Sequence, residues 1–338
     1  MENQQLKPIT ILGAGSWGTA LALYLARRGQ TVNLWSVEIN EVAGMLAERA
    51  NSQFLPGFDF PEHIYPTANL AEAVKHIDDI IIAIPSVGFR ATLIMLKPLI
   101  TPSIRITCAT KGLDTDTGQL LNEVVAEVLG RDYKFAVLSG PSFAREVAAG
   151  LPAAVVIASR DKKLLSEQTQ RFNSSIFRVY PSNDVPGVEV GGVVKNVIAI
   201  ATGISDGMEL GANARCALIT RGLAEMARLA TTLGGKLETI IGLSGMGDLI
   251  LTCTDNLSRN RRLGLAIGKG QEPEAAEREI GQVVEGKRNA ELVSQLAAQY
   301  QIDMPICEAT WQVLQGKITA QEAVERLLDR PTQETPVA

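Results

Sequence analysis

A glycine-rich loop near the start of this chain constrains the fold more than any other feature. The apolar run Ile9–Leu12 is typical of a strand, the sequence GAGSWG follows it, and an apolar helical pattern comes next. In such a loop Gly13 permits a tight turn, Gly15 lets backbone N–H groups approach a pyrophosphate, and Gly18 allows helix and strand to pack closely. A purely structural turn matches the same short pattern, but the strand before it and the helix after it favour a dinucleotide-binding loop.

Short apolar strands alternating with helical stretches continue through the first half of the chain. This alternation predicts a parallel sheet covered by helices on both faces, a doubly wound α/β fold of the Rossmann type. Several of these strands end in polar, Gly- or Pro-containing turns, which is where such sheets bind ligands. The expected strands are 9–12, 31–35, 80–84, 104–108, 135–138, 153–158 and 176–180.

The pattern changes near Asn183, and no further strand is expected beyond it. Apolar residues then recur at helical spacing, which predicts an all-helical second domain. We expect a dinucleotide-binding domain over residues 1–185, a helical substrate-binding and catalytic domain over 186–330, and a polar tail over 331–338. The clearest helical stretches are 193–204, 214–230, 261–267, 290–298 and 320–328.

Composition and charge exclude several classes of protein. A chain of 338 residues exceeds the usual size of one core, so two domains are expected. A net charge of −5 argues against a nucleic-acid partner. The N-terminus lacks the layout of a signal peptide, so we expect a cytoplasmic protein. The longest apolar stretch, 188–204, contains Glu189 and Lys195, so no membrane-spanning helix is expected.

Cysteine and histidine offer little chemistry. The four cysteines, Cys108, Cys216, Cys253 and Cys307, are widely spaced, so we expect buried thiols and neither a disulfide framework nor a metal site. The chain has only two histidines and neither lies in a motif. A general acid must therefore be another residue type.

Two lysines and one aspartate are candidates for that chemistry. Lys195 lies in an apolar helical run, where burial would lower its pKa and make it a usable proton donor. A lysine extended towards solvent, or ion-paired at a helix end, is the alternative. Lys111 follows a predicted strand end and precedes a glycine, either facing a ligand or simply solvated. Asp248, beside three glycines, either lies near Lys195 or caps a helix.

Two further segments suit an anionic ligand. In the run Ser139–Ala144, Gly140 is followed by Pro141 at an expected helix start, whose N–H groups could face a ligand. A helix cap without a ligand would have much the same sequence. The run Ser258–Arg262 combines a capping serine with guanidinium groups, which suits one phosphate as well as a solvated basic turn. The residues alone leave these alternatives open.

Together and in this order, the motifs resemble bacterial NAD(P)-dependent glycerol-3-phosphate dehydrogenases, and the likeness runs from about Ile9 to about Leu328. Several of the matching segments are long and specific, so chance agreement is not a serious alternative. They are 13–20, 51–57, 138–147, 189–196, 242–248 and 258–262.

The resemblance implies hydride transfer between a nicotinamide and C2 of dihydroxyacetone phosphate, giving sn-glycerol 3-phosphate for phospholipid synthesis. It implies that Lys195 is the proton donor or acceptor, assisted by Lys111 and Asp248. The substrate contacts it implies are Lys111, Gly140, Ser142, Lys195, Asp248, Ser258, Arg259 and Asn260. The cofactor contacts implied, with the loop glycines Gly13, Gly15 and Gly18, are Ser16, Trp17, Lys111, Ala144, Arg259, Val283 and Glu285.

The choice between NAD and NADP depends on the residues after the second strand. Relatives often carry a basic residue there, whereas this chain has Ser36, Val37 and Glu38. An acidic residue favours the ribose hydroxyl of NAD, but Arg27 and Arg28 are close in sequence and Glu38 could begin the next helix. We expect use of both cofactors, with the preference left open.

Two other functions compete with this one. Another two-domain dehydrogenase, acting on a 3-hydroxy acid or sugar acid, would bind a carboxylate in place of a phosphate. A cofactor-binding sensor without turnover is the non-enzymatic alternative. Association into homodimers is plausible for the family, and no integral membrane contact is expected.

Overall fold

The computed structural model describes residues 8–330, which form two compact units. The sheet unit comprises the residues up to Thr110 together with Leu121–Val185, and the helical unit comprises Lys111–Leu120 and the chain from Pro186 onward. The segment examined for a signal peptide, 1–7, and the expected polar tail, 331–338, lie outside the described residues.

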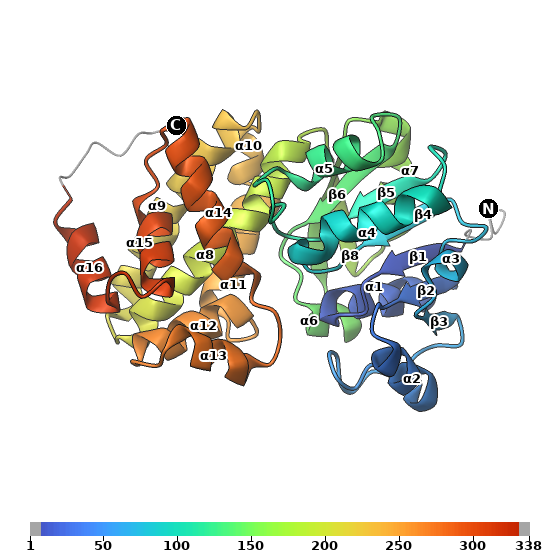
Figure 1. Cartoon of the computed structure of the whole chain (residues 1–338), viewed down its shortest axis with the longest axis horizontal. Helices are drawn as coiled ribbons and strands as arrows, with labels where there is room; N and C mark the ends of the chain where they lie inside the picture. The colour runs from blue at the N-terminus through green and yellow to red at the C-terminus, as the bar shows by residue number, and fades with distance from the viewer. Residues whose placement is uncertain (1–7, 331–338) are drawn as a thin grey trace. The chain divides into compact units, whose positions relative to one another are not determined.

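The sheet unit is built on eight strands in the order β3-β2-β1-β4-β5-β6-β7-β8 (Figure 1). All neighbouring strands pair in parallel except β6 and β7, which are antiparallel. The doubly wound α/β class is confirmed, with one antiparallel pair in the sheet that was expected to be parallel. The strands are β1 Ile9–Leu12, β2 Val32–Trp35, β3 Ile64–Thr67, β4 Asp79–Ile82, β5 Arg105–Cys108, β6 Lys134–Ser139, β7 Ala153–Ser159 and β8 Phe177–Ser182.

The antiparallel pair has a simple geometric cause. A parallel crossover must carry the chain back along the whole preceding strand, which for the six residues of β6 is about 20 Å. The only helix between β6 and β7 is α6 (Ala144–Ala148), five residues long and therefore about 7 Å. The chain turns back instead of crossing over.

Strand β3 was not expected from the sequence. It reads Ile-Tyr-Pro-Thr, with Tyr65 exposed and Pro66 unable to donate to a neighbour, so it lacks the apolar run of the inner strands. As the edge strand it tolerates the proline, because only β2 pairs with it.

The sheet separates two apolar clusters, as a covered sheet must. Along β4, Ile81 belongs to one cluster, whereas Ile80 and Ile82 belong to the other. Because alternate side chains leave a strand on opposite faces, both faces are buried by helices. The helices of this unit are α1 Ser16–Ala26, α2 Ile39–Glu48, α3 Leu70–Ala73, α4 Phe89–Leu96, α5 Leu121–Val128, α6 and α7 Lys162–Phe172, with short 3₁₀ turns at Ser86–Gly88 and Lys97–Leu99.

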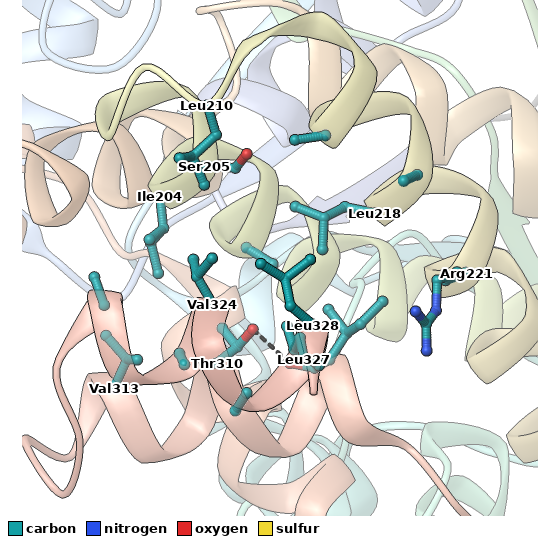
Figure 2. A pocket seen from close by; sticks show the side chains of 17 residues that line it. Ile204, Ser205, Leu210, Leu218, Arg221, Thr310, Val313, Val324, Leu327 and Leu328 are labelled. Carbon is teal, nitrogen blue, oxygen red and sulfur yellow. Dashed lines mark hydrogen bonds between the residues drawn. The ribbon is translucent and has the colours of Figure 1, made fainter. Parts of the chain in front are cut away.

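No strand occurs in the described part of the helical unit, as expected. The five predicted helical stretches all coincide with helices, but α10, α11, α13 and α15 were missed. The helices are α8 Val185–Gly207, α9 Gly211–Thr232, α10 Leu237–Ile240, α11 Asp248–Thr254, α12 Arg259–Gly268, α13 Pro273–Ile280, α14 Glu285–Tyr300, α15 Pro305–Leu314 and α16 Ala320–Leu328, with a π-helical turn, η3, at Leu243–Gly247. Helices α8, α9, α15 and α16 line an apolar pocket (Figure 2).

Helix α8 is the centre of the helical unit. Nearly all of its residues from Val188 to Ile204 are buried. It crosses α12 at glycines on both helices: a Cβ on Gly203 would lie 2.3 Å from the Arg261 carbonyl oxygen, and one on Gly264 would lie 2.1 Å from that of Ile200. Only glycine allows this backbone contact, so α8 and α12 are held in one register.

Residues 111–120, which the sequence analysis assigned to the first domain, pack with the helical unit. Leu113 and Leu120 are buried in its core, and Arg288 Nη2 donates to the Thr115 carbonyl oxygen at 3.0 Å. Because this segment lies inside a strand–helix–strand pattern, the sequence gives no signal that it packs with the helical unit. Consequently Lys111 belongs structurally to the helical unit.

Three of the four cysteines are buried. Cys108, Cys253 and Cys307 are buried, but Cys216 is exposed on α9, so the expectation of four buried thiols is wrong there.

Two helical stretches among residues 8–330, Val185–Gly207 and Leu237–Thr254, are long and apolar enough for a membrane span by length and composition. The first of these is wholly buried within the protein, as a core helix is.

Candidate active site

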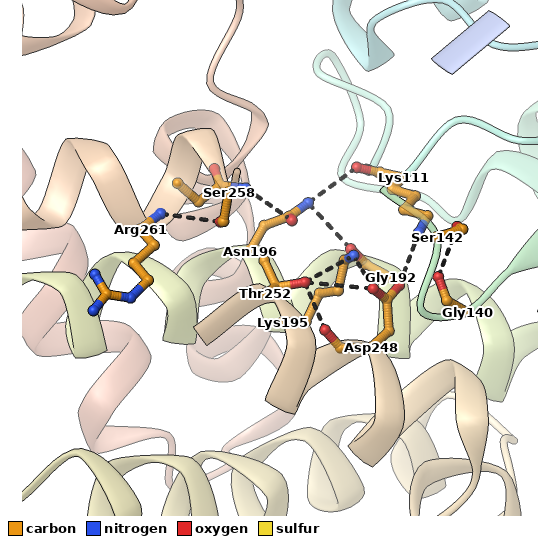
Figure 3. A network of polar contacts seen from close by, with 11 residues as sticks. Lys111, Gly140, Ser142, Gly192, Lys195, Asn196, Asp248, Thr252, Ser258 and Arg261 are labelled. Carbon is orange, nitrogen blue, oxygen red and sulfur yellow. Dashed lines mark hydrogen bonds and ion pairs between the residues drawn. The ribbon is translucent and has the colours of Figure 1, made fainter. Parts of the chain in front are cut away.

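Lys195, Asp248 and Lys111 form a buried ion-pair cluster in the helical unit (Figure 3). Lys195 Nζ donates to Asp248 Oδ1 at 2.5 Å, and Lys111 Nζ donates to Asp248 Oδ2 at 2.8 Å. The Asp248 residue is 1% exposed and the Lys195 residue 6%. Of the alternatives for Lys195, a lysine extended to solvent is wrong, whereas an ion-paired lysine is present, in the middle of α8 and not at a helix end. The three residues come from α8, α11 and the 111–120 segment, so only the fold brings them together.

Burial makes this cluster chemically unusual. Desolvation lowers the pKa of Lys195 to about 7, although the Asp248 carboxylate opposes this shift and the Lys111 ammonium adds to it. Burial alone would raise the pKa of Asp248, but its two ammonium partners lower it below the usual value. The cluster therefore holds a permanent carboxylate beside a lysine that can gain or lose a proton near neutral pH.

A glycine on α8 lets the segment before Asp248 approach the helix that carries Lys195. A Cβ on Gly191 would lie 2.4 Å from the Ser244 carbonyl oxygen, so the backbones of α8 and η3 are in contact. Asp248 is the first residue of α11, and its N-cap is Gly247, so the alternative of an N-cap aspartate is wrong. The close approach suggested by the three glycines is real.

Thr252 is a member of the cluster that the sequence analysis missed. Its Oγ1 accepts a hydrogen bond from Lys195 Nζ at 3.2 Å and donates to the Asp248 carbonyl oxygen at 2.5 Å. It lies one helical turn after Asp248, and that spacing is the only sequence signal for it.

Asn196 was also missed, and it links three elements. Its Oδ1 accepts from Asn260 Nδ2 at 2.9 Å, and its Nδ2 donates to the Gly192 carbonyl oxygen at 3.2 Å. Asn260 Oδ1 in turn accepts from the Gly286 N–H at 2.9 Å. Asn260 therefore joins the starts of α12 and α14 to α8, so part of its amide is already used within the protein.

The start of α12 has the geometry expected of an anion site. Ser258 is the N-cap, and its Oγ accepts from the Arg261 N–H at 3.2 Å. Arg259 Nη1 donates to Gln282 Oε1 at 3.3 Å, and burial lowers the pKa of Arg259 while Glu285 partly offsets the shift. Arg259 is thus a half-buried guanidinium at a helix N-terminus, favourable for a phosphate.

Arg261 fixes the start of α12 through contacts with two other helices. Its Nη2 donates to Asp206 Oδ2 at 2.6 Å, and its Nε donates to the Cys253 carbonyl oxygen at 3.1 Å. Asp206 also accepts from Arg215 at 2.8 Å. Arg261 therefore ties α12 to the end of α11 and to α8.

Of the two predicted cofactor residues near α14, Glu285 is its first residue, and Val283 is 49% exposed just before it. Glu285 lies near the Arg259 guanidinium, whose pKa its charge raises. These two residues and Arg259 thus lie near one another in the helical unit.

The sheet unit carries the glycine loop, and its geometry fits a pyrophosphate. Gly13 has φ +112°, and a Cβ there would lie 2.7 Å from the Ala83 carbonyl oxygen, while one on Gly18 would lie 1.9 Å from the Gly13 carbonyl oxygen. By contrast, apart from its chain neighbours, no heavy atom of residues 8–330 lies within 4 Å of a Cβ on Gly15. The loop thus packs closely on one side and leaves the other side open, at the N-terminus of α1, where no side chain caps the helix.

The neighbouring predicted residues have defined contacts. Ser16 Oγ donates to the Phe54 carbonyl oxygen at 2.7 Å, and Trp17 Nε1 is buried with no hydrogen-bond partner among residues 8–330. A buried indole N–H without a partner at this loop is available to an acceptor from a ligand.

The Ser139–Ala144 segment departs from one expectation. Helix α6 begins at Ala144 with Phe143 as N-cap, so Pro141 does not start a helix. Gly140 has φ +139° and packs against β7, and Ser142 Oγ donates to its carbonyl oxygen at 2.9 Å. The reversal of the chain into the antiparallel β7 uses this positive φ and delays the helix.

The segment after β2 contains no basic side chain. Glu38 is the exposed N-cap residue of α2, and Ser36 Oγ donates to Glu41 Oε2 at 2.7 Å. Arg27 Nη1 donates to the Ala148 carbonyl oxygen, and Arg28 Nη2 donates to that of Asn173 at 3.2 Å. Both arginines thus donate to carbonyl oxygens just past the C-terminal end of α1.

The described residues hold no group of three His, Cys, Asp or Glu side chains that could bind a metal ion.

Comparison with known proteins decides the family. The model of the NAD-dependent glycerol-3-phosphate dehydrogenase N-terminus matches residues 8–165, and that of the C-terminus matches residues 184–325. The chain belongs to the NAD-dependent glycerol-3-phosphate dehydrogenase family. The resemblance predicted from the motifs is confirmed.

Relatives within the family are similar over nearly their whole length. The chain is 50% identical to the glycerol-3-phosphate dehydrogenase [NAD(P)+] of Vibrio parahaemolyticus over 324 residues, covering 95% of this chain and 94% of the relative. The crystal structure of glycerol-3-phosphate dehydrogenase from Coxiella burnetii has 50% sequence identity to this chain, with a TM-score of 0.94, and covers 96% of this chain and 99% of that chain. The structure of the Saccharomyces cerevisiae enzyme has 25% sequence identity and a TM-score of 0.81, and covers 96% of this chain and 99% of that chain.

Proposed function

We propose that this chain, as an NAD(P)-dependent glycerol-3-phosphate dehydrogenase, interconverts dihydroxyacetone phosphate and sn-glycerol 3-phosphate. The observation that carries the proposal is the buried Lys195, whose pKa of about 7 is held beside the Asp248 carboxylate. Family membership and the names of the relatives support the substrate and the cofactor type.

When bound, the nicotinamide supplies or accepts the hydride at C2. Lys195 Nζ donates a proton to the C2 oxygen during reduction and takes it back during oxidation, which a pKa near 7 permits in both directions. Lys111 places a second ammonium beside the developing alkoxide and stabilises its charge. Asp248 holds both ammonium groups in place and balances their charge.

The phosphate is held at the start of α12 in this proposal. Ser258 organises the helix N-terminus, Arg259 supplies the guanidinium, and the free N–H groups of the first turn point towards an anion. Asn260 shapes this turn through its hydrogen bonds with Asn196 and Gly286. Its side-chain amide has a second N–H, which donates to the phosphate in this proposal. Gly140 and Ser142 complete the proposed substrate contacts from the sheet unit.

The cofactor binds at the glycine loop, with its pyrophosphate on the open side of Gly15 and at the N-terminus of α1. Gly13, Ser16, Trp17, Gly18 and Ala144 are the proposed contacts in the sheet unit, and Lys111, Arg259, Val283 and Glu285 are those in the helical unit. Because residues 36–41 include two carboxylates and no cation, we propose use of both cofactors with NADH favoured. Steady-state kinetics with NADH and NADPH side by side test this preference.

The test of the function is reduction of dihydroxyacetone phosphate by the purified protein. Wild type should consume NADH, and Lys195→Met should lower kcat by at least about a thousandfold while NADH still binds in a fluorescence titration. Lys163→Met, at a lysine whose side chain is 77% exposed, is the matched control and should leave kcat unchanged. Near-normal turnover by Lys195→Met would refute the assigned role.

Ligand competition separates the rival dehydrogenase function. A phosphate-bearing inhibitor such as glycerol 2-phosphate should compete with the substrate, and a 3-hydroxy acid should not. The reverse order would favour an enzyme acting on a carboxylate substrate.

We further propose that the enzyme is a cytoplasmic homodimer without an integral membrane segment, and that its product enters phospholipid synthesis. Light scattering after gel filtration tests the dimer, and fractionation of cells tests the compartment.

A further inference from the structure

The apolar pocket of the helical unit is separate from the residues assigned to catalysis. It has a volume of about 160 Å³ and lies among α8, α9, α15 and α16 (Figure 2). None of the residues proposed to bind substrate or cofactor lines it. The proposed function therefore leaves this pocket without a role.

The walls of the pocket are almost entirely aliphatic. Ile204, Leu218, Val313, Val324 and Leu327 are typical of its lining. These side chains suit a hydrocarbon group, because burying apolar surface is favourable by about 25 cal/mol per Å². The occupant should therefore have an apolar body.

One cation and one unpartnered hydroxyl interrupt this lining. Arg221 is the only charged residue that lines the pocket, it is exposed, and it makes no hydrogen bond or ion pair within residues 8–330. Ser205 is 2% exposed, and its buried Oγ has no hydrogen-bond partner in the described part of the chain. Because Ser205 Oγ is itself buried, the charge of Arg221 is the exposed polar group that the pocket offers to a ligand.

We propose that this pocket binds a small amphipathic monocarboxylate with a tail of about six to eight carbons. A cavity of about 150 Å³ accommodates benzene, which sets the tail near that size. The carboxylate pairs with the Arg221 guanidinium, and the tail contacts the aliphatic wall. A dianionic phosphate fits less well, because no second cation lines the pocket.

Octanoate is the probe, and the protein is the full chain. Two-dimensional NMR or calorimetry should show saturable binding with Kd on the order of 1 mM, since a ligand of about ten heavy atoms reaches that range. Octanol, which has the same tail without the charge, should bind about tenfold more weakly. The dehydrogenase reaction is not needed for the measurement, so the result is independent of the proposed function.

Two variants, each with a matched control, assign the binding to this pocket. Arg221→Gln should weaken octanoate about tenfold and leave octanol unchanged, whereas Arg278→Gln, at an exposed arginine on α13, should change neither. Ala217→Phe places a ring at an exposed lining position of α9 and should block both ligands. Ala212→Phe, at an exposed residue of the same helix that does not line the pocket, is its control.

Equal binding of octanoate and octanol, no effect of Arg221→Gln, or no effect of Ala217→Phe would each overturn the proposal. Absence of saturable binding because a second copy of the chain covers this face, detected by light scattering, would overturn it as well.

Discussion

Replacing Asp248 with asparagine should move the pH dependence of the reaction, because its carboxylate supports the charge on Lys195. Lys195 Nζ lies 2.5 Å from Asp248 Oδ1, and the Lys111 ammonium contacts the other oxygen. Asp248→Asn keeps the shape of the side chain and removes the negative charge. The Lys111 ammonium then remains near Lys195 without compensation.

The size of the shift follows from Coulomb's law. Two unit charges about 4 Å apart interact by about 4 kcal/mol at an effective dielectric constant near 20, and one pKa unit corresponds to about 1.4 kcal/mol. Loss of the carboxylate should therefore lower the pKa of Lys195 from about 7 by roughly one to three units. Solvent entry and movement of Lys111 should weaken the interaction, so we expect a pKa shift nearer to about one unit than to three.

The assay is kcat/KM for oxidation of sn-glycerol 3-phosphate against pH, since this direction requires the deprotonated lysine. Wild type should show a limb that rises with pH around 7, and Asp248→Asn should show the same limb at lower pH with a smaller plateau. The ionisation of the substrate phosphate affects both proteins equally and cancels in the difference. In the reductive direction wild-type activity should instead fall above pH 7, because the protonated lysine is the donor.

Thr252→Ala is the comparison variant, since it removes a neutral partner of Lys195 Nζ. Its limb should move by less than about half a unit, because no charge is lost. A limb near pH 7 in Asp248→Asn would refute the argument that this carboxylate sets the proton affinity of Lys195.

Three further predictions concern stability, the cofactor and the phosphate. Burial raises the pKa of Glu225 to about 7 from 4.5, so its stabilising contribution is present below pH 4.5 and is lost as the pH rises through 7. Urea unfolding should give a loss of up to about 3 kcal/mol for wild type between pH 5 and 8 and a flatter profile for Glu225→Gln; identical profiles would contradict this. Gly15→Val should keep the melting temperature and weaken NADH at least about tenfold, whereas Gly18→Val should unfold the loop, because its Cβ would meet a carbonyl oxygen at 1.9 Å. Arg261→Lys should raise KM for dihydroxyacetone phosphate about tenfold with NADH affinity unchanged, and Arg215→Gln, at the other partner of Asp206, should change KM by less than about twofold.

Local patterns in the sequence were sufficient for the inner strands and the long helices. The run Ile80–Ile84 is apolar because β4 is buried on both faces, and the loop before α1 needs glycine at Gly13 and Gly18 for reasons local to a few residues. The edge strand β3 and the antiparallel direction of β7 were missed because neighbouring strands decide them. The position of residues 111–120 likewise depends on core contacts made by Leu113 with the helical unit.

The protonation chemistry of Lys195 could not be decided from its own surroundings in the sequence. An apolar helix allows a lysine either to reach solvent or to be buried, and the outcome depends on a carboxylate 53 residues away, at Asp248. Burial without that carboxylate would carry the cost of an isolated charge, and the carboxylate without burial would leave the lysine protonated at neutral pH. Only the close contact of α8 with η3, permitted by Gly191, supplies both conditions at once. A larger residue at Gly191 should therefore impair proton transfer even though its own side chain has no chemistry to contribute.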